Sequence, residues 1–341
     1  MIWNPARKIQ LLLFAFLLVP ATAFADSQAL SREEIIEEAL EQVSTNGQAH
    51  SQELMEEEES VDWAEEPEIL LQEFEAPDQP FLEDDSDWMR FAGDKRFEIG
   101  YEYYNFIYEE PDVMRDEGFM QGLYAYYTYY GYFTPEFYGN DRYMFRLEAR
   151  YADGEVDYEN SGSMEDIDDY AFEVRGLVGS VFTNGNYAAI PYLGFGYRYL
   201  NDDSGGRITS TGYYGYERES EYYYIPAGVN LIADLDNGWF FETNLEFDIF
   251  CSGQQTSHLS DVDSGYNDLE NDQNNGYGAR ASLRLRKDFG LIDIVIEPYI
   301  RYWNIKKSED SNFTYSNVII GYGYEPKNNT REYGLRGAIR F

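Results

Sequence analysis

The stretch that decides the fold is residues 141–152, which read DRYMFRLEARYA. Every second position is apolar or aromatic, namely Tyr143, Phe145, Leu147, Ala149 and Tyr151. The positions between them are mostly charged, namely Arg142, Arg146, Glu148 and Arg150. A period of two is typical of a β-strand whose two faces meet different surroundings. This segment therefore predicts a strand with one apolar face and one charged face.

The same alternation extends outward in both directions and predicts ten strands in all. The other nine are expected near residues 95–108, 119–133, 168–182, 187–200, 221–234, 239–251, 277–288, 291–305 and 328–341. Tight turns are expected at 183–186, 235–238 and 287–290, with a slightly longer turn at 134–140. Long polar loops are expected at 109–118, 153–167, 201–220, 252–276 and 306–327. Short turns at one end and long loops at the other are typical of transmembrane barrels.

Alternation alone leaves two fold classes open, because a soluble β-sandwich or lipocalin-like barrel also alternates, with its apolar face inward. Two features favour the membrane. Arg and Glu lie in the middle of the predicted strands, and the apolar rows are flanked by Tyr and Trp, which membrane interfaces favour. We therefore predict an all-β fold, a transmembrane antiparallel up-and-down β-barrel over residues 95–341 with both of its ends in the periplasm.

Two further segments precede the predicted barrel. Residues 1–25 contain Arg7 and Lys8, an apolar run and a small-residue site ending at Ala25, which is the layout of a secretory signal peptide. An uncleaved membrane anchor is the alternative, but the run is too short to span a bilayer as a helix. Residues 26–94 hold 23 acidic residues against Arg32 and Arg90. We predict an acidic periplasmic extension, with a possible short helix after Ser31, that is either a solvated tether or a docking segment for a periplasmic partner.

The chain ends on an alternating strand, residues 332–341, which read EYGLRGAIRF. This ending resembles the C-terminal strand of Gram-negative outer-membrane β-barrel proteins, a family that includes porins. The resemblance implies a location in the outer membrane, contact with its lipid and lipopolysaccharide, and recognition by the barrel assembly machinery. It implies no activity.

The inward faces of the predicted strands carry a nearly balanced set of charges. The acids are Glu98, Glu102, Glu148, Glu173, Glu242, Glu246, Asp248, Asp293, Glu297 and Glu332. The bases are all arginine: Arg96, Arg142, Arg146, Arg150, Arg175, Arg198, Arg280, Arg284, Arg286, Arg301, Arg336 and Arg340. Strand 239–251 offers acids and strand 277–288 offers arginines, so opposite charges can pair across the ladder.

A ten-stranded barrel is narrow, so we predict a lumen closed by these ion pairs and a structural or surface-interaction protein. Tyr213, Tyr214, Tyr216 and Tyr222 to Tyr224 would let the third outer loop make such contacts. A narrow gated channel lined by the same residues is the alternative. A net charge of −39 disfavours nucleic-acid partners.

Catalysis has little support in the sequence, and we predict neither a catalytic site nor a cofactor. The histidines are His50 and His258, and the Asp-x-His motif expected of ten-stranded omptin-type proteases is absent at His258. A hydrolase is therefore the least favoured reading. Loop 261–272 is rich in oxygen ligands but lacks EF-hand spacing, and no metal site is predicted. Cys251 is the single cysteine, which excludes an intrachain disulfide.

Overall fold

The fold is that of a computed structural model, which describes residue 91 and residues 95–132 and 142–341. The predicted signal peptide, the acidic extension apart from Phe91, and the predicted turn at 134–140 lie outside these residues. No helix in the described parts of the chain has the length and hydrophobicity needed to span a bilayer.

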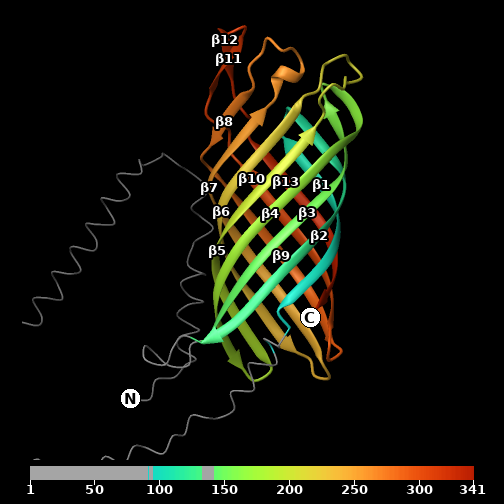
Figure 1. The fold of residues 1–341 in the computed structure, drawn as a ribbon, viewed down its shortest axis with the longest axis vertical. Helices are drawn as coiled ribbons and strands as arrows, with labels where there is room; N and C mark the ends of the chain where they lie inside the picture. Colours follow the sequence, from blue (N-terminus) through green and yellow to red (C-terminus); the bar gives the residue numbers. More distant parts are fainter. Residues whose placement is uncertain (1–90, 92–94, 133–141) are drawn as a thin grey trace, which may run out of the picture. The chain divides into compact units, whose positions relative to one another are not determined.

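Ten antiparallel strands form a closed barrel, which confirms the predicted fold class (Figure 1). They are β1 (Phe97–Glu110), β2 (Met114–Tyr132), β3 (Arg142–Asn160), β4 (Gly162–Asn184), β5 (Tyr187–Asp203), β6 (Glu217–Asp234), β7 (Trp239–Ser257), β9 (Gly276–Asp288), β10 (Asp293–Ile305) and β13 (Asn328–Arg340). Each strand pairs with its neighbours in sequence order, and the pairing of β1 with β13 closes the barrel. Closure gives each of these ten strands a hydrogen-bonded neighbour on both edges, as a barrel in a membrane requires.

The barrel has two different ends. One end carries the tight connections between β4 and β5, β6 and β7, and β9 and β10, together with Phe341, and we call it the short-turn end. The other end carries the long connections between β5 and β6, β7 and β9, and β10 and β13, together with short connections between β1 and β2 and between β3 and β4, and we call it the loop end. Three elements lie there: β8 (Leu269–Gln273) pairs with the extension of β7, a short 3-10 helix spans Leu259–Asp261, and β11 (Ser311–Tyr315) with β12 (Val318–Gly323) forms a separate hairpin (Figure 1).

Several strands are longer than predicted at the loop end. Residues 153–167, expected as a loop, continue β3 and β4 to a turn near Ser161, and residues 114–118 of the expected first loop belong to β2. The polar composition of 153–167 predicts a loop, but alternation persists there. Val156, Met164 and Ile167 point into the core, while the acids between them are on the outside. Solvated carboxylates on one face and buried apolar side chains on the other still make a strand.

The exterior of the barrel is apolar over its middle section. Leu123, Leu193 and Leu335 are among the exposed apolar side chains, each more than half exposed. Toward the loop end this surface finishes in a row of tyrosines: Tyr103, Tyr151, Tyr170, Tyr199, Tyr223, Tyr277, Tyr302 and Tyr333. Several adjacent rings are in contact, with centroids about 6 Å apart. Beyond the row, β2 to β5 present acids outward, namely Glu117, Asp153, Glu155, Asp157, Asp166, Asp168 and Asp203.

Candidate functional site: the lumen of the barrel

The lumen is filled by three successive layers of side chains. The layer at the short-turn end is apolar. Phe91, from the segment before β1, is buried there and packs edge-on against Phe240 of β7, with ring centroids 6.4 Å apart. The same cluster contains Met144, Leu177, Val181, Ala188, Ile190, Tyr192 and Ile232. These strand residues come from β3 to β7, whereas the charged side chains of Arg286, Asp293 and Arg340 lie at the same end on β9, β10 and β13.

The middle layer is a network of buried ion pairs centred on Glu102 of β1 and Glu332 of β13. Glu102 accepts hydrogen bonds from Arg150 and Arg336 at 2.8 Å each and from Arg301 at 3.2 Å. Glu332 pairs with Arg301 at 2.6 Å, Arg198 at 3.0 Å and Arg150 at 3.1 Å. Arg150 and Arg301 thus bridge both carboxylates. Because the planar guanidinium offers several donors in fixed directions, it suits such shared pairing.

The predicted pairing between neighbouring strands is part of this network. In the register of β7 and β9, Glu242 lies opposite Arg284 and Glu246 lies opposite Arg280. Arg280 contacts Glu246 at 3.1 Å and also Asp248 at 2.8 Å. Each of these arginines has a second role, however, because it reaches across the lumen to a distant strand.

The cross-lumen pairs join strands that are far apart in sequence. Arg280 contacts Glu173 of β4 at 2.5 Å, and Arg284 contacts Glu98 of β1. Arg284 also pairs with Glu297 of the neighbouring strand β10, at 3.3 Å. The remaining pairs of this layer are Arg175 with Glu148 and Glu246, Arg286 with Glu242 and Asp293, Arg336 with Glu297, and Arg340 with Asp293. The network therefore crosses the lumen and does not merely line it.

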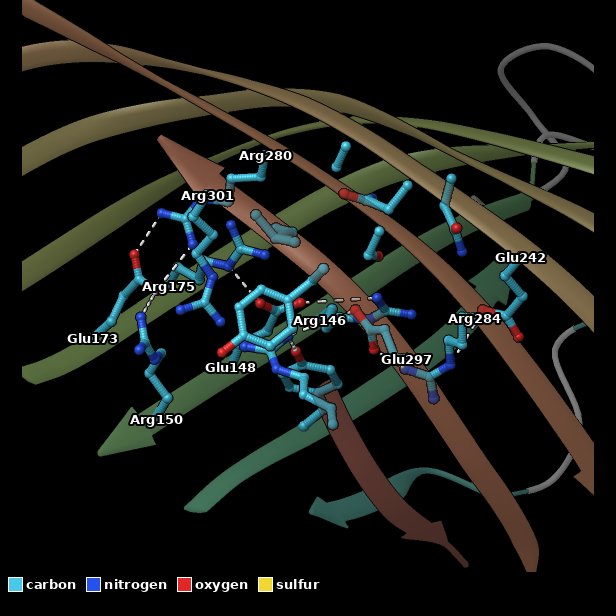
Figure 2. A pocket seen from close by; sticks show the side chains of 18 of the residues that line it. Arg146, Glu148, Arg150, Glu173, Arg175, Glu242, Arg280, Arg284, Glu297 and Arg301 are labelled. Atoms are coloured by element: carbon cyan, nitrogen blue, oxygen red, sulfur yellow. Dashed lines mark hydrogen bonds and ion pairs between the residues drawn. The ribbon is translucent and has the colours of Figure 1, made fainter. Parts of the chain in front are cut away.

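A small cavity remains inside the network (Figure 2). It measures about 70 Å³ and is lined by both signs of charge, with Arg146, Arg175, Arg284 and Glu148 among its walls. Figure 2 shows these side chains converging from different strands on the barrel interior. At about 10–15 Å³ of such volume per water, the cavity has room for only a few water molecules.

The layer nearest the loop end is aromatic. Trp303 of β10 is buried between Tyr222 and Tyr224 of β6, with centroids 6.2 and 5.0 Å away. The guanidinium of Arg198 lies 5.3 Å from the centre of the Trp303 ring, a cation–π distance. Tyr104, Phe106, Met120, Ile167, Leu200 and Phe250 belong to the same cluster. Aromatic side chains therefore cover the ion pairs from the loop end.

Four inward glycines make room for inward tyrosine rings. Gly100, Gly196, Gly228 and Gly334 each lie under a ring from another strand, and a Cβ added at any of them would come within about 2.6 Å of that ring. The ring over Gly334 is that of Tyr299. Rings lying over glycines fill space and shield backbone inside a curved sheet.

A second, smaller charge cluster closes the loop end beyond the tyrosine row. Arg218 of β6 contacts Glu110 of β1 and, at 2.9 Å, Glu325, which follows β12. The Tyr108 hydroxyl donates to Glu325 at 2.8 Å. Burial raises the pKa of the Glu325 carboxyl to about 7, and nearby Glu110 adds to the shift against the opposing effect of Arg218. The segment after the β11–β12 hairpin is thus held to the barrel wall through Glu325, whose buried carboxyl has a pKa of about 7.

Asp116 of β2 and Asp202 of β5 face the same cluster. Burial raises the pKa of Asp202 to about 6, and it raises the pKa of Asp116 well above its usual range, with Asp202 adding to the effect. Sequence reasoning left both residues outside the charge network. Their alternation with Gly118 and Leu200 could have placed them inward.

All thirteen residues chosen from the sequence as the core of the lumen network lie in the barrel interior and make polar contacts there. They are Arg146, Glu148, Arg150, Glu242, Glu246, Asp248, Arg280, Arg284, Arg286, Glu297, Arg301, Arg336 and Arg340. Arg96 is different from the expectation. Its side chain is exposed, and its guanidinium lies 5.1 Å from the centre of the Tyr129 ring at the rim of the short-turn end.

His258 lies at the loop end, outside the lumen. Its Nε2 is 3.2 Å from Glu219 and its Nδ1 is 3.4 Å from Asp268. Partial burial disfavours the charged ring, but the two carboxylates outweigh this and raise the pKa of His258. Among the described residues, no group of three or more His, Cys, Asp or Glu side chains is arranged to hold a metal ion.

Comparison with known proteins gives no family for the chain. No protein-family profile matches it, and no curated protein matches its sequence. Among solved structures, the Escherichia coli outer membrane protease OmpT is similar with a TM-score of 0.42 and 7% identity, covering 72% of this chain and 97% of that chain.

Two other solved structures are similar at a lower level. They are the translocator domain of the autotransporter NalP from Neisseria meningitidis (TM-score 0.33, 12% identity, 72% of this chain and 88% of that chain) and the Pseudomonas putida toluene transporter TodX (TM-score 0.28, 8% identity, 74% and 91%). Similarities of this size transfer no activity to the chain.

Proposed function

We propose that this protein is a bacterial outer-membrane β-barrel whose closed lumen makes it a structural and surface-interaction protein and not a pore. The observation that carries the proposal is the ion-pair network that crosses the lumen between the apolar layer and the aromatic layer. Conduction needs a continuous path of water, and ion pairs that cross the lumen between apolar and aromatic side chains oppose one. The barrel then serves as a rigid anchor for the structures at its loop end.

The exterior supports the membrane setting. An apolar surface that finishes in a row of tyrosines matches the requirements of a bilayer core and its interface. The short turns would face the periplasm, together with the acidic segment 26–94 and any partner of that segment. The loop end would face outward, where the acids of β2 to β5 would meet the phosphates of lipopolysaccharide through shared divalent cations. The final strand would be the element that the barrel assembly machinery recognises.

Planar-bilayer recording tests the closed lumen. The purified full chain, inserted into bilayers containing lipopolysaccharide, is expected to give no steady unitary current. Insertion is checked separately by heat-modifiable gel migration and by protease resistance of the barrel. Steady currents from correctly inserted protein would overturn the proposal and favour the narrow channel.

The proposal includes no enzymatic step. His258 with its two carboxylates is the nearest arrangement to a general base, and it lies on an exposed loop. Incubating outer-membrane vesicles with peptide and lipid substrates, using wild-type protein and His258→Ala, tests this part. Turnover that depends on His258 would contradict it.

A further inference from the structure

The β11–β12 hairpin extends beyond the barrel at the loop end (Figure 1). Its two strands differ in how their outer edges are covered. The hairpin is closed by a two-residue turn at Ser316 and Asn317, both with positive φ, as tight hairpin turns require. It forms its own two-stranded sheet and pairs with none of the barrel strands. Each of the two strands therefore has one edge whose backbone hydrogen-bonding groups find no partner within the hairpin.

The free edge of β11 is covered by the preceding loop. Tyr266 bridges to Tyr315 and stacks on Phe313, with ring centroids 5.1 Å apart. Asn267 donates its backbone N–H to the Thr314 carbonyl at 3.3 Å, and its side-chain oxygen accepts from the Thr314 N–H at 2.6 Å. The loop thus acts as a third, irregular strand beside β11.

The outer edge of β12 has no such cover among the described residues. Val318, Ile319, Ile320 and Tyr322 are all more than half exposed. The polar contact of β12 outside the hairpin is at its end, where Asn271 donates to the Gly323 carbonyl at 3.2 Å. A strand with an open edge and apolar side chains on both faces is a template for another strand.

Natural proteins usually protect such an edge with charges or proline, and this hairpin has neither. Residues 311–324 contain no Asp, Glu, Lys, Arg or Pro, although the chain as a whole carries a net charge of −39. Copies of so acidic a protein repel one another over most of their surface. The uncharged hairpin is a place where two copies can approach without that repulsion.

We propose that β12 pairs edge to edge, in antiparallel register, with β12 of a second copy of this chain. The inference rests on the proposed function as a surface-interaction protein and names its partner. A two-fold axis makes such a contact self-complementary, since the same strand supplies both sides. The paired sheet would have four strands, β11–β12–β12–β11, with its outer edges already covered by the loops that hold β11.

A cysteine scan along β12 tests the register. In a Cys251→Ser background, single cysteines replace each residue from 318 to 323, and disulfide-linked dimers are measured by non-reducing gel after mild oxidation. Antiparallel partners on the axis have Cα atoms about 4.5–5.5 Å apart, within disulfide reach. A cysteine one residue further along the strand lies two residues, about 7 Å, from its copy in the partner strand, which is beyond disulfide reach. We expect cross-linking at one position or two adjacent positions near the strand centre.

Two results would overturn the pairing. Equal, weak cross-linking at all positions would indicate random collision, and cross-linking at every second position would indicate parallel strands.

A second experiment measures the dimer by analytical ultracentrifugation in detergent, where Ile320→Lys should abolish it. Its matched control, Ile208→Lys, makes the same substitution at an exposed isoleucine of another loop and should leave the dimer intact.

The two proposals fail separately. Channel currents would overturn the closed lumen whatever the cross-linking shows. A silent bilayer with no register-specific cross-link, or an Ile320→Lys variant that dimerises normally, would overturn only the β12 contact.

Discussion

Replacement of Glu102 by Gln is expected to destabilise the barrel more than any single surface change. The substitution keeps the shape of the side chain and removes its charge. Glu102 is fully buried and contacts Arg150, Arg336 and Arg301, so three guanidinium groups lose a counter-charge together. Each hydrogen bond to a charged group contributes about 1.5–3 kcal/mol.

The three contributions do not simply add. Arg150 and Arg301 keep Glu332, at 3.1 and 2.6 Å, and Arg336 keeps Glu297 at 3.6 Å. The loss is therefore closer to that of breaking one buried ion pair, about 3–5 kcal/mol in the free energy of unfolding.

Urea unfolding in lipid vesicles, followed by tryptophan fluorescence, measures this loss. The matched control is Glu117→Gln, which makes the same chemical change in an exposed pair with Arg115 on the barrel exterior and should cost no more than about 1 kcal/mol. If the two variants unfold at the same urea concentration with the same slope, the buried network does not stabilise the barrel.

Three further predictions concern other layers of the lumen. Gly334→Ala should lower the free energy of unfolding by about 1–3 kcal/mol, because the new methyl group meets the Tyr299 ring. Its control is Gly337→Ala on the same strand, where the methyl group meets open space and should change the free energy of unfolding by about 0.5 kcal/mol or less. Phe91→Ala should lower the unfolding free energy by about 3–5 kcal/mol yet leave bilayers silent, because the ion pairs lie beyond it. The pKa of Glu325 is about 7 in the folded protein against 4.5 unfolded, so this carboxyl keeps a proton on folding that it loses in the unfolded chain, and its contribution to stability should fall as pH rises from about 4.5 to 7. Glu325→Gln should therefore reduce the fall of stability with pH in urea titrations at several pH values, leaving the part due to Asp202.

Alternation was sufficient to predict the barrel and much of its interior. Strand 141–152 has a charged face and an apolar face, so period two places Arg146, Glu148 and Arg150 on one side without reference to the rest of the chain. The opposing acids and arginines of β7 and β9 followed from the same reasoning applied to neighbouring strands. The sequence could not show which arginines contact carboxylates across the lumen, because those distances depend on how the barrel closes.

The apolar layers inside the lumen were missed for a related reason. Ile190 and Leu200 occupy inward positions in β5, which is largely apolar on both faces, so their pattern resembles the lipid-facing rows. Phe91 was missed because it lies before the first strand, where alternation provides no signal. The opposite error occurred at 153–167, where the polar residues predict a loop although the acids among them form the solvated face of two long strands.

The closing strand unites the fold with the charge network. In β13, Arg340 lies opposite Glu98 of β1 and Asp293 of β10, and Arg336 lies opposite Glu102 and Glu297. At both arginine positions, the last strand therefore faces a carboxylate on each of its two neighbouring strands.

This complementarity distinguishes the correct register at the seam. A slip of one residue would turn the charges toward lipid, which the apolar exterior forbids. A slip of two residues would preserve the inward and outward faces, so apolar patterning alone would tolerate it. It would, however, place Arg336 opposite Gly100 or Tyr104 of β1 and leave a buried guanidinium without its carboxylate. Since an unpaired buried charge is among the most costly errors a fold can contain, we infer that the charges that fill the lumen also select the one register in which the barrel closes.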